Sequence, residues 1–222
     1  MSLVDLKDLS NLLNAPSLFF YWVDLLVALA IPLLFVFPYM AHRISRFSWL
    51  LFCIGCAVGA LWEIPFYFIG PSFSSDPLYV LKTPAPYPLF LLHVMHCFWD
   101  GGLLMIGVGL VKKLCRSPHF TQFRFQELAV LLVWGGFQEL AVELFSSGSS
   151  GWVYVPHWWN PSMFQFQGSD ITLLPQLIWV IAPIVFYVLA LLLAKSVNEK
   201  LPLKPLLVDT AMNKFHSDRL EK

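Results

Sequence analysis

Long apolar stretches separated by short polar connections dominate this chain. A helix needs about 20 mainly apolar residues to cross the hydrocarbon core of a bilayer. Five stretches meet this requirement: residues 17–40, 49–70, 89–111, 125–147 and 171–194. We therefore expect an all-α membrane protein in which residues 1–195 form a single bundle of five transmembrane helices and residues 196–222 form a cytoplasmic tail.

Composition narrows the possible partners. Only 13% of the residues are charged, about half of the roughly 25% that is usual in a soluble globular domain. The formal net charge is zero and no run of basic residues is present, so a nucleic-acid partner is not expected. The expected partners are the membrane and a hydrophobic small molecule or lipid. The membrane could be the endoplasmic reticulum or the bacterial inner membrane, and the oligomeric state stays open.

The distribution of basic residues predicts the orientation. Cytoplasmic connections of membrane proteins are enriched in Lys and Arg. Of the 14 basic residues, all except Lys7 and Lys82 fall after the first and third predicted helices or after the fifth. This side is expected to be cytoplasmic, which places the N-terminus outside or in the lumen.

Polar and ionisable residues recur inside the predicted helices. Such groups are unfavourable in hydrocarbon unless they are paired or hydrated, so each is a candidate for function. With the predicted orientation, every helix carries these residues in its outer half. They are Asp24, Glu63, His93, His96, Asp100, Gln138, Glu139, Glu143 and Gln176. A bundle that turns them inward would enclose one polar pocket with apolar walls, and the aromatic segment 151–160 could lie over its mouth.

Spacing brings several of these residues onto shared faces. Residues three or four positions apart lie on one side of a helix, which groups His93 with His96 and Asp100, and Glu139 with Glu143. The candidate catalytic residues are Glu63, His96, Asp100 and Glu139. The candidate substrate-binding residues are Trp62, His93, Glu143, Gln176, Trp179 and Trp158.

Each of these residues also has a structural interpretation. Asp24, near a helix start, and His157 are interpreted as interfacial residues or packing hydrogen bonds. The catalytic candidates could likewise form only a structural network. A bundle gains little stability from buried ionisable groups, which favours a functional interpretation of the combination.

Proton chemistry on a lipid is the first interpretation of the pocket. A carboxyl group in an apolar wall is more stable uncharged than charged, which suits a general acid. Glu63 is assigned this role. His96 could act as the base, with Asp100 orienting its imidazole or stabilising the charged form of the imidazole. Trp179 could offer its ring face to a developing carbocation, although an ordinary packing tryptophan is the alternative. This chemistry needs no cofactor.

A metal site is the second interpretation. His93, His96 and Asp100 place two imidazoles and a carboxylate on one helix face, and nearby glutamates could complete one or two ions. Di-iron helix bundles usually repeat a Glu-x-x-His unit on two helices. No such unit occurs in this chain, so the spacing permits a metal without specifying one.

Two cysteines have the spacing of a redox pair. Cys53 and Cys56 are separated by two residues on the second predicted helix, in a Cys-x-x-Cys pattern. They fall toward the cytoplasmic side, away from the polar residues. Gly55 and Gly59 in the same segment form a Gly-x-x-x-Gly pattern, which favours close packing between membrane helices. We therefore expect this segment to serve helix packing rather than redox chemistry.

With these residues identified, the chain resembles the emopamil-binding-protein, or EXPERA, family over about residues 55–195. Gln176, Trp179 and Pro183 are similar to the family's Asn-x-x-Trp-x-x-x-Pro pattern, and Glu63 lies in an aromatic setting like the family's helix-2 acid. The resemblance implies four or five transmembrane helices that act as a sterol isomerase or a sigma-2-type receptor. Gly59 stands where the isomerases carry a histidine one turn before that acid, and His96 stands where the family has a helix-3 acid. The pair Trp62–Glu63 also resembles small transmembrane terpene cyclases.

These observations predict a membrane enzyme that isomerises or cyclises a sterol-like or isoprenoid lipid by protonating a double bond. A lipid-binding or lipid-shuttling protein without catalytic activity is the first alternative. A metal-dependent membrane enzyme is the second.

Overall fold

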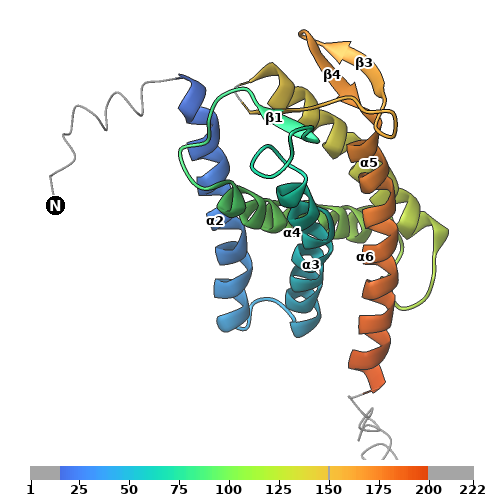
Figure 1. Cartoon of the computed structure of the whole chain (residues 1–222). Helices are drawn as coiled ribbons and strands as arrows, with labels where there is room; N and C mark the ends of the chain where they lie inside the picture. Colours follow the sequence, from blue (N-terminus) through green and yellow to red (C-terminus); the bar gives the residue numbers. More distant parts are fainter. Residues whose placement is uncertain (1–15, 150, 200–222) are drawn as a thin grey trace, which may run out of the picture.

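Five long helices form the body of the computed structural model, which describes residues 16–149 and 151–199 (Figure 1). Within these residues the five helices are long and apolar enough to cross a membrane. They are α2 (Pro16–Met40), α3 (Arg46–Phe68), α4 (Leu89–Leu114), α5 (Phe125–Gly148) and α6 (Leu173–Glu199). The expected five membrane-spanning helices are therefore confirmed. Most of the predicted tail lies outside the described residues, and residues 196–199 continue α6.

Local sequence signals explain where the helices begin. Ser45 precedes α3, and its hydroxyl accepts a hydrogen bond from the backbone N–H of Ser48 at 3.1 Å, which satisfies a donor that the first turn leaves free. Pro88 directly precedes α4. Its backbone is not helical (φ −56°, ψ 136°), so the helix begins at the next residue. Pro65 and Pro183 lie inside α3 and α6, as membrane helices allow.

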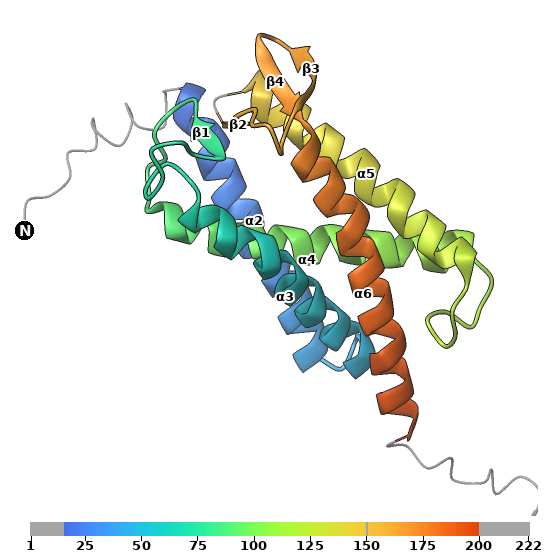
Figure 2. The ribbon, with the colours of Figure 1, turned by 45° about the vertical axis from the view of Figure 1, so that its right-hand side comes forward.

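The helices pack in a defined order. α4 contacts α2, α3 and α5, while α6 contacts α3 and α5 (Figure 2). α3 and α4 approach most closely at Gly55, where an added Cβ would lie 3.0 Å from the Cα of Gly101. The expected small-residue packing at Gly55 is confirmed, and Cys53 and Cys56 are free cysteines beside it.

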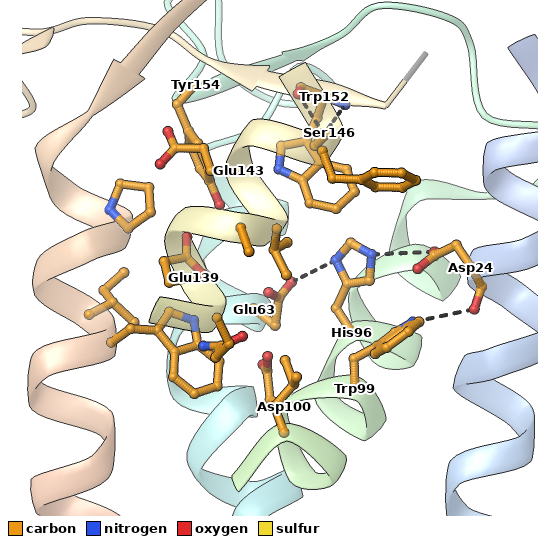
Figure 3. Close-up of a pocket in the computed structure, with 18 of the residues that line it drawn as sticks. Asp24, Glu63, His96, Trp99, Asp100, Glu139, Glu143, Ser146, Trp152 and Tyr154 are labelled. Carbon is orange, nitrogen blue, oxygen red and sulfur yellow. Dashed lines mark hydrogen bonds and ion pairs between the residues drawn. The ribbon is translucent and has the colours of Figure 1, made fainter. Parts of the chain in front are cut away.

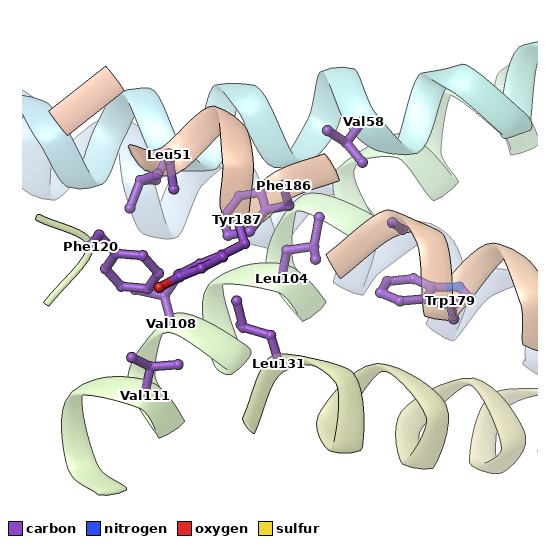
Figure 4. Packing of buried hydrophobic residues seen from close by; sticks show 12 residues of the cluster. Leu51, Val58, Leu104, Val108, Val111, Phe120, Leu131, Trp179, Phe186 and Tyr187 are labelled. Carbon is purple, nitrogen blue, oxygen red and sulfur yellow. The ribbon is translucent and has the colours of Figure 1, made fainter. Parts of the chain in front are cut away.

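One apolar cluster fills the centre of the bundle. It joins α3 through Leu51, α4 through Leu104, α5 through Leu131 and α6 through Phe186 and Tyr187 (Figure 4). All five of these side chains are almost completely buried. This packing fixes the relative positions of four helices just below the level where their polar residues lie.

Short strands at one end of the bundle were not expected from the sequence. β1 (Tyr79–Leu81) pairs antiparallel with β2 (Trp152–Tyr154), and β3 (Ser162–Phe166) pairs with β4 (Ser169–Thr172). Residues 71–88 and 151–172, which contain these strands, are called the cap below. The fold therefore contains more than apolar helices, because the α3–α4 connection and the α5–α6 connection are joined by backbone hydrogen bonds between β1 and β2.

A buried acid at the opposite end also differs from expectation. Glu127 is fully buried near the start of α5, and its carboxylate accepts hydrogen bonds from the N–H of Phe120 at 3.2 Å and the hydroxyl of Tyr187 at 3.0 Å. The expectation that every helix carries its polar residues at one end overlooked this residue. Its contacts anchor the α4–α5 connection to α6, which is a structural role.

Candidate functional site

A cavity of about 650 Å³ lies between the helices at the cap end of the bundle. All five helices and β2 contribute to its wall. Most of the wall is apolar, but carboxyl groups from four different helices face it (Figure 3). These are Asp24 of α2, Glu63 of α3, Asp100 of α4 and both Glu139 and Glu143 of α5.

The structure brings together most of the residues selected from the sequence. Glu63, His96, Asp100 and Glu139, the catalytic candidates, all line the cavity (Figure 3). Of the substrate-binding candidates, Trp62, Glu143 and Trp179 also line it. His93, Gln176 and Trp158 do not.

The three remaining candidates have other positions. His93 is buried behind Glu63 and contacts it without facing the cavity. Gln176 donates a hydrogen bond to Glu143. Trp158 is 93% exposed in the cap, so its assignment to the pocket wall was wrong. Its place in an aromatic segment suggested proximity to the pocket, but the cap turns this part of the segment outward.

Glu63 is the centre of a buried polar network. Its Oε2 lies 2.7 Å from Nδ1 of His93 and 3.6 Å from Nδ1 of His96. Nε2 of His93 lies 2.7 Å from the hydroxyl of Tyr79 in β1. A carboxylate can only accept hydrogen bonds, so a neutral His93 would donate from Nδ1 to Glu63 and accept at Nε2 from Tyr79. The cap thereby fixes the orientation of a helix-borne acid.

Asp24 completes the network on the other side of His96. Its Oδ2 lies 3.4 Å from Nε2 of His96, within ion-pair distance. Nε1 of Trp99 donates to the Asp24 backbone carbonyl at 3.3 Å (Figure 3), which ties α2 to α4. The sequence interpretation gave Asp100 the role of orienting His96 or stabilising its charged form. Asp24 and Glu63, not Asp100, lie at the two imidazole nitrogens, so the orienting role does not fall to Asp100.

Asp100 and Glu139 differ from Glu63 in having no hydrogen-bond partner among the residues that the structure describes. Both are buried, at 6% exposure each, and both line the cavity. Asp100 packs over Gly59, where an added Cβ would lie 2.5 Å from its Oδ2. Gly59 therefore provides the room that Asp100 occupies.

Glu143 has a structural role despite its position in the cavity wall. Oε1 accepts from the backbone N–H of Thr172 at 3.1 Å, and Oε2 accepts from Nε2 of Gln176 at 2.8 Å. The carboxylate thus joins α5 to β4 and α6. Both of its oxygens are engaged, so it is less available to a ligand than Glu139 one turn earlier.

Aromatic rings form the rest of the wall. The rings of Trp62 and Trp179 meet edge to face with centroids 5.7 Å apart, and the ring of Trp152 lies 4.9 Å from that of His96. Tyr154 of β2 also lines the cavity, and burial together with the nearby carboxyl groups of Glu139 and Glu63 raises its pKa well above the usual value. Its hydroxyl therefore remains a hydrogen-bond donor throughout the physiological pH range. The sequence marked the segment of Tyr154 as aromatic but could not select this residue.

The proposed metal ligands do not converge. Both imidazoles, His93 and His96, turn their Nδ1 atoms toward Glu63, and Asp100 contacts neither of them. Across residues 16–149 and 151–199, no three His, Cys, Asp or Glu side chains are grouped as a metal ion would require. The polar side chains of the site instead form hydrogen bonds and ion pairs with one another.

Comparison with known proteins found no family model, no curated protein and no solved structure that matches this chain. The function proposed below therefore rests on the residues of the site itself.

Proposed function

We propose that this protein is a membrane enzyme that isomerises or cyclises a sterol-like or isoprenoid lipid by protonating one of its double bonds. The observation that carries this proposal is the pair of buried carboxyl groups, Asp100 and Glu139, that form no hydrogen bond with any other described residue and face a mainly apolar and aromatic cavity. An apolar site with a few convergent polar groups is the usual form of a lipid or small-molecule site.

The contacts of each carboxyl group suggest its role. A carboxyl group without a partner in an apolar wall is suited to carry a proton and deliver it to a substrate. Asp100 and Glu139 fit this description better than Glu63, which was the acid expected from the sequence. Glu63 is held between two imidazoles, so it is better suited to positioning His96 than to protonating an alkene.

The reaction balances without an external reagent. The acid adds a proton to one carbon of a double bond, and the positive charge develops on a neighbouring carbon. In cyclisation a second double bond attacks this cation. His96, with Asp24 and Glu63 on its two sides, then removes a proton from an adjacent carbon. One proton enters and one leaves, so the product is an isomer of the substrate.

The aromatic residues would stabilise the cation. The faces of tryptophan rings attract positive charge, and the attraction is stronger in a site without water. Trp62 and Trp179 lie together in the cavity wall. The resemblance of Trp179 and its neighbours to the EXPERA pattern supports the same role.

Turnover in deuterated water tests the proposal. The purified protein is reconstituted in phosphatidylcholine vesicles with a panel of sterols and linear isoprenoid alcohols, and isomeric products are identified by mass spectrometry. An isomer that carries one deuterium on carbon is expected. Asp100→Asn, Glu139→Gln and His96→Gln should each lower the rate about 10²–10⁴-fold if the residue transfers the proton, whereas the exposed Trp158→Ala should not.

Two results would contradict the proposal. If all three variants fold and turn over an identified substrate at the wild-type rate, the assigned residues are wrong. If a lipid copurifies, is recovered unchanged, and binds the variants with altered affinity while no product forms, the protein is a lipid-binding or lipid-shuttling protein.

A further inference from the structure

We propose that the cavity opens sideways into the bilayer between α2 and α5, and that this seam admits a lipid whose reactive end enters while its apolar tail stays among the membrane lipids. The inference uses the same cavity as the proposed function. It concerns access and ligand class, and it holds for an enzyme or for a lipid-binding protein.

The cap closes the end of the cavity. The hydroxyl of Ser146 accepts from the N–H of Trp152 at 2.9 Å and donates to its carbonyl at 2.7 Å, so β2 is fastened to the end of α5. Lys82 donates to the carbonyl of Ser147 in the same region. A ligand that entered from this end would have to break these contacts.

The other helix pairs around the cavity are packed together. α3 lies against α4, α5 against α6, and α3 against α6. The interior below the cavity is filled by the apolar cluster around Leu104 and Phe186. Between α2 and α5, in contrast, no hydrogen bond or ion pair joins the two helices in the part of the chain that the structure describes. α2 is held instead by α4 and α3.

Side chains along the seam are both part of the cavity wall and open to the outside. Phe19 and Val23 of α2 line the cavity yet are 65% and 40% exposed. Phe145 and Val142 of α5 line it as well and are 68% and 36% exposed. Side chains with both properties border the place where the cavity lies nearest the outside of the bundle. Because both helices are apolar enough to span a membrane, this place faces lipid tails.

The ring of Phe20 on α2 lies in the seam and contacts rings of α5 and β2. The ring of Phe20 lies 6.0 Å from that of Phe145 and 5.7 Å from that of Trp152. A ring pair of this kind contributes about 0.5–1.5 kcal/mol beyond the area it buries, and it involves no hydrogen bond. Rotation of Phe20 would therefore widen the opening without breaking a polar contact.

The arrangement of polar groups defines the ligand. His96 and Asp100 line the interior of the cavity, whereas the exposed lining residues Phe19, Val23 and Phe145 on the two sides of the seam are apolar. A ligand with a compact reactive end and a long apolar tail matches this gradient. Water-soluble substrates, in contrast, would have to cross the bilayer to reach the mouth.

Thiol labelling from the two phases tests this inference without knowledge of the natural ligand. Leu103→Cys places a thiol in the cavity wall. The variant in phosphatidylcholine vesicles is treated with N-dodecylmaleimide, which resides in the bilayer, or with a charged, water-soluble maleimide. Labelling is read at residue 103 by peptide mass spectrometry, so the native cysteines can stay. We expect the membrane-resident reagent to react at least 10-fold faster.

A plug and its matched control locate the entrance. Ala141→Trp fills the seam, because Ala141 lines the cavity on α5, whereas Phe137→Trp alters another exposed position of α5 that lies outside the cavity wall. The plug should slow labelling at residue 103 at least 10-fold and the control should not. Ile178→Cys, on α6 in the opposite wall, serves as a second thiol if Leu103→Cys does not fold.

Three outcomes would overturn the inference: faster labelling by the charged reagent, no labelling by either reagent, or equal effects of the two tryptophan variants. Loss of catalytic turnover in other experiments would leave these labelling ratios unchanged, so failure of the proposed function and failure of the entrance can be told apart.

Discussion

Replacing Glu143 by methionine should loosen the bundle, while the same replacement at Glu139 should not. The two glutamates lie one turn apart on α5 and are both buried, at 2% and 6% exposure. Methionine has a similar length and helix propensity but accepts no strong hydrogen bond. The pair of variants therefore isolates the hydrogen bonds of Glu143 from the general effect of removing a carboxyl group.

The contacts give the size of the effect. Glu143→Met removes the acceptor of the Thr172 backbone N–H, in a residue that is completely buried, and an unpaired buried donor costs about 1–3 kcal/mol. The amide of Gln176 also loses its acceptor, but this residue is partly exposed and regains some hydration. The free energy of unfolding should fall by about 2–3 kcal/mol, which corresponds to a Tm lower by about 4–12 °C in a chain of this size.

Glu139→Met should behave differently because Glu139 loses no hydrogen bond and an apolar group replaces a buried polar one. Its Tm should equal or exceed that of the wild type. The melting of both variants is followed by tryptophan fluorescence in the same mild detergent, and protease cleavage within β3 and β4 reports detachment of the cap. Equal melting of Glu143→Met and the wild type, or an equal loss in both variants, would refute the distinction between a structural and a functional carboxylate.

Two further predictions concern packing and the cap. Gly135→Ala should lower the free energy of unfolding by about 1–3 kcal/mol, because the added Cβ would lie 2.7 Å from the Trp179 carbonyl oxygen and 2.8 Å from Cγ of Pro183. Gly136→Ala is the control, because its added Cβ would meet nothing within 4 Å. In the same melting assay it should be neutral or stabilising by up to about 1 kcal/mol. Trp158→Ala should change neither the Tm nor the labelling at residue 103, because the side chain is 93% exposed, and a drop in either would place Trp158 in contacts that the structure does not contain.

Hydropathy determined the number of helices and placed each of their bounds within five residues of the observed one. The predicted segments 49–70 and 125–147 correspond to α3 (Arg46–Phe68) and α5 (Phe125–Gly148). This success has a simple cause. A backbone in hydrocarbon must satisfy its own hydrogen bonds, so a long apolar segment has little choice but a helix. The strands β1 and β2 escaped prediction because their pairing joins residues about 70 positions apart, such as Val80 and Val153.

Helical periodicity was sufficient to gather the wall residues but not to pair them. The spacing of His96 and Asp100 placed both on the face of α4 that borders the cavity, yet it suggested that they contact each other. Neighbours on one helix face need not bond when a better partner arrives from another helix. Here Asp24 of α2 and Glu63 of α3 flank His96.

By itself, the sequence determined that this protein has five membrane-spanning helices with polar residues concentrated toward one end. Both properties follow from local rules, namely the length of apolar segments and the depth of each residue along its helix. Only the tertiary structure decided that Glu63 lies near two imidazoles, that Asp100 and Glu139 form no hydrogen bond with the other described residues, and that side chains of all five helices line one cavity. These features depend on how the helices are rotated and packed against one another, which no single helix encodes.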